Sequence, residues 1–162
     1  MRPLAVCQRQ DILPSDMNDE TLRVVRDAAA AAFRDTPVFL AYAYGSRASG
    51  TPRADSDLDI GYYLSRSYER HDLPLYDQML IEARLSGAIG LSVDLRNLAD
   101  APLELRGKAL EEGVRVYCSD QKARVAIETA LLSRYHDYKP TLAASHEQRL
   151  AALAAAGSLP HG

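Results

Sequence analysis

Stretches of helical periodicity alternate with short apolar runs along most of the chain. Between residues 19 and 33, apolar side chains recur at helical spacing after acidic residues that suit a helix N-terminus. The following run VFLAYAY, at residues 38–44, is short and rich in strand-forming residues, which predicts a buried strand. Pro37 separates the two elements, because proline disrupts a helix.

The same criteria predict the remaining elements. A break is expected at Pro140, which should end one helix, and the alanine-rich helix after it carries Leu150 and Leu153 as its apolar stripe. A fold with helices between about four strands is typical of an α/β or α+β protein, here a small mixed sheet flanked by helices. The further strands are predicted at 57–64, 91–98 and 114–118, and the further helices at 73–90, 101–113, 120–138 and 145–157.

Length and composition narrow the class of protein. A chain of 162 residues is expected to form a single domain over 1–162, with its core at about 20–138 and a C-terminal helical extension at 140–162. No apolar run approaches the roughly 20 residues of a membrane span. The N-terminus lacks the long apolar core of a signal peptide, so a cytoplasmic location is expected.

The charge balance bears on possible partners. The net charge of −3 disfavours a dedicated nucleic-acid-binding protein, which is usually basic. It does not disfavour a protein that binds a nucleotide through a metal ion, because the metal supplies the positive charge. From the charge we expect no direct contact with nucleic acid, and from the lack of a long apolar run we expect no association with a membrane.

Two aspartates interrupt the strand predicted at 57–64. Asp57 and Asp59 are two residues apart, so their side chains leave the same face of the strand about 7 Å apart along the backbone. Like charges this close on a partly buried sheet repel and lose hydration, whereas a hard divalent cation such as Mg²⁺ would bind between them. Asp94, in the strand predicted at 91–98, could complete a three-carboxylate cluster if the two strands are adjacent. Such a cluster is typical of a two-metal phosphoryl- or nucleotidyl-transfer site.

A glycine and a serine follow the strand predicted at 38–44. Gly45 ends that strand, and Ser46 is suited to cap a short helical turn over 47–49, so backbone N–H groups and a hydroxyl would point outward. Helix N-termini of this kind bind anions, phosphates in particular. The pattern predicts that Gly45 and Ser46 hold a triphosphate whose metals lie on the aspartates. The alternative is a polar loop with Asx turns, in which Asp94 is an incidental edge residue.

The motif Gly45-Ser46, ten residues, Asp57-Leu58-Asp59 resembles the signature of the DNA polymerase β-like nucleotidyltransferase superfamily. The resemblance implies the polymerase β-like nucleotidyltransferase fold and the use of Mg²⁺ in a two-metal site. It also implies that Asp57 and Asp59 hold the Mg²⁺ ions and orient the triphosphate.

Two longer segments are similar to the minimal (MNT-type) members of this superfamily, above all to the antitoxins of HEPN–MNT toxin–antitoxin pairs. They are YGSRASGTPRADSDLDIGYYL at 44–64 and SVDLRNLADAPLELRGKALEEGVRVYCSD at 92–120, within a resemblance that covers about 20–138. Asp94 matches the third carboxylate, which would ligate the catalytic metal and help to deprotonate the attacking hydroxyl. The extension after Pro140 is not assigned by the match.

The resemblance also implies how phosphate is bound. Gly45 and Ser46 would contact the nucleotide phosphates. Arg47 and Arg53 are candidate phosphate contacts, although arginines in such a loop can equally be simply solvated.

The activity implied is transfer of AMP from ATP, the donor substrate, to a tyrosine of a partner HEPN ribonuclease toxin, which silences the toxin. Carboxylates and backbone donors suffice for this chemistry, so no histidine or cysteine nucleophile is needed. Two alternatives stay open. The chain could be a small-molecule nucleotidyltransferase of the aminoglycoside type that works as a dimer, or a non-catalytic antitoxin that acts by occlusion.

Overall fold

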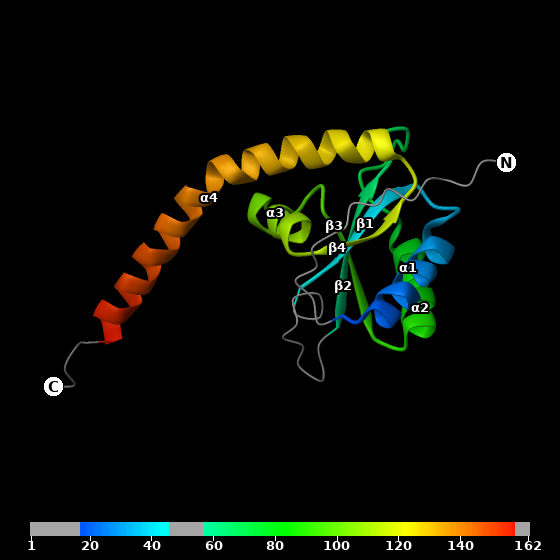
Figure 1. Ribbon diagram of the computed structural model, residues 1–162, viewed down its shortest axis with the longest axis horizontal. Helices are drawn as coiled ribbons and strands as arrows, with labels where there is room; N and C mark the ends of the chain where they lie inside the picture. The colour runs from blue at the N-terminus through cyan, green and yellow to red at the C-terminus, as the bar shows by residue number, and fades with distance from the viewer. Residues whose placement is uncertain (1–16, 46–56, 158–162) are drawn as a thin grey trace.

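Helices and strands alternate in the computed structural model, which describes residues 17–45 and 57–157 (Figure 1). Apart from the last two predicted helices, the helices and strands predicted within the described ranges are present, with ends that differ by at most two residues. The predicted α/β fold, with a small mixed sheet flanked by helices, is confirmed. In chain order the elements are α1 (Asp19–Phe33), β1 (Val38–Tyr44), β2 (Leu58–Leu64), α2 (Leu75–Ile89), β3 (Val93–Asn97), α3 (Leu103–Glu111), β4 (Val114–Cys118) and α4 (Gln121–Gly157).

The four strands form one mixed sheet in the order β3-β2-β1-β4. Strand β1 is antiparallel to both β2 and β4, whereas β2 and β3 are parallel and are connected through α2. The pairing sets Tyr44 opposite Asp59, and Asp59 opposite Asp94. A row of three polar side chains therefore crosses β1, β2 and β3 near one end of the sheet.

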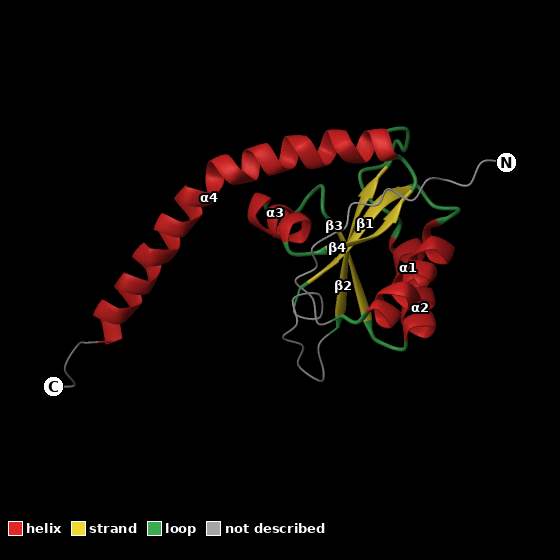
Figure 2. Cartoon of the chain, in the orientation of Figure 1, coloured by secondary structure: helices red, strands yellow, loops and turns green. Residues whose placement is uncertain are grey.

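Helices cover both faces of the sheet, α1 and α2 on one face and α3 with the first part of α4 on the other (Figure 2). Strand β1 lies in the interior of the sheet between β2 and β4, and every residue of it is buried. This explains why VFLAYAY is apolar without alternation, since both of its faces meet a hydrophobic cluster.

The prediction that Pro140 ends a helix is wrong. Helix α4 runs without interruption from Gln121 to Gly157, so the two helices predicted at 120–138 and 145–157 are one. A proline inside a helix removes one N–H donor and crowds the carbonyl four residues earlier, which kinks a helix whose flanking residues still favour the helical state. Figure 1 shows α4 changing direction between its yellow first part and its orange and red second part.

The second part of α4 projects away from the sheet (Figure 1). From residue 139 to residue 157 every side chain is exposed except that of Leu142, which is half-buried. Leu150 and Leu153, the predicted apolar stripe, are 62% and 69% exposed. Within the described ranges, no helix combines the length and apolar character that crossing a membrane would require.

Candidate functional site

Asp59 and Asp94 lie side by side on neighbouring parallel strands. Their Cα atoms are register partners of β2 and β3, and adjacent strands are about 4.8 Å apart. The alternation of side chains places Leu58 and Ile60 in the core against α1 and α2, so Asp59 between them points to the face that carries α3. Asp94 is exposed and Asp59 is half-buried. The structure thus brings these two predicted site residues together.

The charges of the aspartates act on one another. Burial raises the pKa of Asp59, the negative charges of Asp94 and Asp57 raise it further, and the positive charge of Arg96 opposes them. Asp57, directly before β2, is exposed, and its charge also acts on Asp59. Tyr44 responds to the same charges: burial raises its pKa, Arg96 lowers it, and Asp59 and Asp94 raise it. The site therefore contains a cluster of like charges, and the positive charge of Arg96 partly compensates them.

Gly45 packs directly against Asp59. Its φ of +83° lies in the left-handed region that side chains with a Cβ rarely adopt. A Cβ at this position would also collide with Oδ2 of Asp59. Both the conformation and the space therefore require glycine, and the close approach brings the backbone at the end of β1 to the carboxylate.

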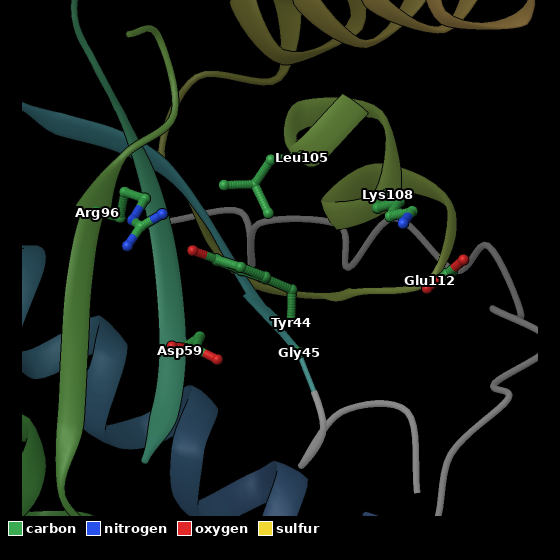
Figure 3. Close-up of a pocket in the computed structure, with 7 residues that line it drawn as sticks. All are labelled: Tyr44, Gly45, Asp59, Arg96, Leu105, Lys108 and Glu112. Atoms are coloured by element: carbon green, nitrogen blue, oxygen red, sulfur yellow. The ribbon is translucent and has the colours of Figure 1, made fainter. Parts of the chain in front are cut away.

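A cavity of about 370 Å³ opens above these residues (Figure 3). The ring of Tyr44 and the side chain of Leu105 provide an apolar part, and charged groups from β2, β3, α3 and the C-cap of α3 line the rest. This volume is at the lower end of the range of small-molecule pockets. The lining residues are Tyr44, Gly45, Asp59, Arg96, Leu105, Lys108 and Glu112.

Helix α3 forms one wall of the cavity because it packs closely on α4. A Cβ at the buried Gly107 would collide with the ring of Tyr135 in α4, so only glycine allows this approach. Within α3, Lys108 Nζ lies 3.1 Å from Glu104 Oε1, and this hydrogen bond raises the pKa of Lys108. Lys108 thus already has an anionic partner.

Three predicted phosphate contacts, Ser46, Arg47 and Arg53, and the short helical turn predicted at 47–49 lie outside the described residues. Of the other predicted site residues, Gly45 and Asp59 line the cavity, while Asp57 and Asp94 are exposed beside them.

Sequence reasoning missed several residues of the cavity. Arg96 could have been found, since it lies two positions after Asp94 and must share its face of the strand. Tyr44 could have been assigned to this end of the sheet from its place beside Gly45. The residues of α3 and its C-cap gave no such signal, because the placement of a helix over a sheet depends on tertiary packing. These are Leu105 and Lys108 in α3 and Glu112 at its C-cap.

The acidic residues match a hard divalent cation in chemistry. Among the described residues, no three histidine, cysteine, aspartate or glutamate side chains converge closely enough to hold a metal ion. The donor set of Asp57, Asp59 and Asp94 nevertheless offers carboxylate oxygens, which Mg²⁺ prefers, and their mutual repulsion raises the pKa of Asp59. Asp57 and Asp94 are exposed, so packing does not lock their side chains in place.

A protein-family model described as "Polymerase beta, Nucleotidyltransferase" matches residues 29–122, more than half of the chain. The matched range includes Gly45 and all three aspartates of the site. No curated protein is significantly similar to the chain in sequence.

Solved structures of toxin–antitoxin complexes contain chains with a similar fold. A toxin–antitoxin structure with AMP-PNP aligns with a TM-score of 0.56 at 19% identity, over 79% of this chain and 97% of that chain. An MntA–HepT toxin–antitoxin structure aligns with a TM-score of 0.54 at 16% identity, over 81% of this chain and 97% of that chain. A complex of tri-AMPylated Shewanella oneidensis HEPN toxin with MNT antitoxin aligns with a TM-score of 0.53 at 16% identity, over 82% of this chain and 98% of that chain. At these identities the similarity shows the fold.

Proposed function

The chain belongs to the polymerase beta nucleotidyltransferase family, and from this membership we propose that it is a Mg²⁺-dependent adenylyltransferase antitoxin. In this proposal it transfers AMP from ATP to a tyrosine of a partner HEPN ribonuclease toxin and so neutralises the toxin. The fold shared with chains of toxin–antitoxin complexes supports the choice of partner, and the AMP-PNP in one of those structures supports ATP as donor.

One observation carries the catalytic part of the proposal: Asp59 faces Asp94 across two parallel strands, with the backbone of Gly45 packed against Asp59. Carboxylates on neighbouring strands repel each other unless a cation binds, and the strand end at Gly45 is where phosphates would lie. The adjoining cavity of about 370 Å³ offers the Tyr44 ring and Leu105 as apolar contacts for a nucleoside.

Each residue then has a defined task. Asp57, Asp59 and Asp94 would hold Mg²⁺, and the backbone of Gly45 with Ser46 would bind the triphosphate. When bound, Mg²⁺ supplies positive charge that lowers the pKa of the attacking hydroxyl and stabilises the leaving pyrophosphate. Asp94, exposed on the edge strand β3, is open to an acceptor and would take the proton of the hydroxyl.

The reaction balances without any redox partner. The acceptor oxygen forms a bond to the α-phosphorus of ATP, and the bond between that phosphorus and the oxygen bridging to the β-phosphate breaks. Pyrophosphate leaves with the electron pair, and the acceptor proton passes to the carboxylate of Asp94. Positioning and charge stabilisation are the main demands on the protein, which fits a site of carboxylates and backbone donors.

The test is a transfer assay with the full chain, Mg²⁺, ATP labelled at the α-phosphate and a purified candidate HEPN partner. We expect label on a partner tyrosine, located by peptide mass spectrometry, and loss of that label with Asp59→Asn. Asp77→Asn, which removes an exposed carboxylate in the first turn of α2, is the matched control and should transfer normally.

The same assay separates the alternatives. Label on an added aminoglycoside and on no protein would favour the small-molecule enzyme. A stable complex that inhibits the toxin without any label would favour occlusion. Transfer that survives Asp59→Asn would exclude the proposed site.

A further inference from the structure

Arg96 is placed by the sheet register next to the two facing aspartates. It pairs with Gly61 in β2, one step along the same face from the pair formed by Asp59 and Asp94. Gly61 contributes no side chain to that face, and the space above it is filled by Leu98. The guanidinium lines the same cavity as Asp59 and Tyr44, as Figure 3 shows.

Within the described ranges, Arg96 has no ionic partner, in contrast to two other cations on this side of the sheet. Lys108 lies 3.1 Å from Glu104, and Arg124 lies 2.6 Å from Glu128. The side chain of Arg96 forms no hydrogen bond or ion pair with any other residue that the structure describes, although its charge acts on both Asp59 and Tyr44. It therefore partly compensates the aspartates at a distance and does not bridge to either one.

A fixed positive charge at this position has opposite effects on the two states of a cation site. In the metal-free protein it reduces the repulsion among the aspartates. When a divalent cation binds to the same carboxylates, the two positive charges repel each other. If the charges are about 7 Å apart, which is the spacing of alternate residues along a strand, their repulsion in a water-like dielectric corresponds to an affinity change of about 5- to 10-fold.

We propose that Arg96 is the built-in counter-ion of the metal-free carboxylate site and that its charge sets the divalent-cation concentration at which the site fills. The inference rests on the proposed function, since it takes the three aspartates as the cation site. It implies that the site stays empty at low cation concentration. The negative charge of a bound triphosphate would offset Arg96 and favour the binding of cation and nucleotide together.

The test measures binding of Mn²⁺ to the full chain without nucleotide, with the paramagnetic resonance signal of free Mn²⁺ as the readout. We expect Arg96→Met to bind Mn²⁺ about 5- to 10-fold more tightly than the unaltered protein at low ionic strength, and the gain to shrink in high salt. Arg96→Lys, which keeps the charge, should stay close to the unaltered protein. Arg84→Met is the matched control, because it removes an exposed arginine from α2 on the opposite face of the sheet.

Thermal unfolding gives a second readout that a purely structural role would not produce. Without metal, Arg96→Met should have a lower Tm than the unaltered protein. Saturating Mn²⁺ should raise the Tm of Arg96→Met by more than it raises the Tm of the unaltered protein. Equal losses of Tm with and without Mn²⁺ would overturn the proposal, and so would unchanged or weaker Mn²⁺ binding by Arg96→Met.

Two further outcomes are distinguishable. If Arg84→Met gains as much Mn²⁺ affinity as Arg96→Met, the effect comes from net charge and the proposal is wrong. If the unaltered protein and Arg96→Met both bind no Mn²⁺, the cation site on which the proposal depends does not exist. Failure of the proposed function reads differently: Mn²⁺ binding would follow the expected order while no acceptor is labelled.

Discussion

The two faces of the sheet are built from the same strands and have different chemistry. The face under α1 and α2 is apolar, with Leu58, Ile60 and Leu85 fully buried. Tyr62 on this face is also fully buried, and its hydroxyl donates to Asp72 at 2.5 Å. This face has the dense apolar packing from which the stability of a small domain is derived.

The face under α3 and α4 mixes apolar and charged groups. The buried Tyr42 donates to Glu128, which also accepts from Arg124 at 2.6 Å and lies 3.5 Å from Arg115. Burial and the hydrogen bond to Glu128 raise the pKa of Tyr42. The cavity with Asp59 lies on this same face.

The comparison shows how one strand can serve both purposes. Because side chains alternate along a strand, Leu58 and Ile60 belong to the core while Asp59 between them belongs to the site. Substitutions on the two faces should therefore separate cleanly, with changes under α1 and α2 lowering stability and changes at the aspartates lowering activity.

The largest effect is expected for Asp94→Asn. Transfer of AMP should fall on the order of 10³-fold or more, as is typical when a catalytic group is removed, because the amide neither binds a cation well nor accepts the proton. The Tm should stay the same or rise slightly, since one of the repelling charges is lost. Labelled-ATP transfer and thermal unfolding on one preparation check both. A large loss of Tm would place Asp94 among the structural residues and break the separation of the faces.

Leu85→Ala tests the opposite face. Leu85 is fully buried against the sheet, so the substitution should lower the free energy of unfolding by about 2–5 kcal/mol. Transfer per folded molecule should be unchanged, because the cavity lies on the other side. Denaturant unfolding gives the stability, and Leu75→Ala, whose side chain is 72% exposed, should stay within about 0.5 kcal/mol.

Gly45→Ala sharpens the comparison at the edge of the site. Both the left-handed backbone and the collision with Asp59 Oδ2 oppose a methyl group, so we expect a stability loss of about 1–2 kcal/mol and a transfer rate lowered about 10²-fold.

Gly90→Ala is the matched control, because Gly90 has a φ of +79° and no atom within 4 Å of an added Cβ. It should lose less stability than Gly45→Ala, because only the backbone strain applies, and it should lose no activity. Equal activity in the two variants would show that displacement of Asp59 has no consequence for transfer.

The smallest effect concerns Glu111, which joins α3 to α4. Its carboxylate lies 2.9 Å from Lys139 Nζ and 2.6 Å from His136 Nε2. Partial burial alone would raise the pKa of Glu111, but the hydrogen bonds from Lys139 and His136 lower it below the ordinary value of 4.5.

Because the pKa is lowered in the folded state, the ionised carboxylate contributes stability above the ordinary value, and the contribution is lost as the pH falls through the lowered pKa. Glu111→Gln should therefore lower the Tm by about 1–3 °C near neutral pH and leave it unchanged in strong acid. Melting curves across the pH range check this, and Glu147→Gln in the exposed part of α4 should match the unaltered protein throughout. A constant difference at every pH would show that Glu111 acts by packing and not by charge.

Much of the fold could be predicted because hydrophobic periodicity reflects burial. The strand at 38–44 is apolar throughout and proved to be the fully buried β1. Pro140 misled because a proline weakens a helix without deciding its end, and the residues on both sides still favour the helical state.

The site could be predicted only in part. The spacing of Gly45, Asp57 and Asp59 is visible in the sequence, and the adjacency of Asp94 was a condition that the parallel pairing of β2 and β3 meets. The position of Arg96 in the site could have been predicted from the alternation of side chains along the strand, but it was not. The contribution of Leu105 depends on how closely α3 packs on α4 at Gly107, which no local pattern encodes.

The uninterrupted α4 has a mechanical consequence. Measured along its axis, the helix of 37 residues is about 55 Å long. A compact chain of 162 residues would have a radius of gyration of only about 15 Å. The part beyond Pro140 is an arm of about 25 Å whose base is fixed by the packing of the first part. A change of about 20° in the bend at that proline would move the tip by about 9 Å. The angle at one residue therefore sets where anything held at the end of the arm lies relative to the aspartates.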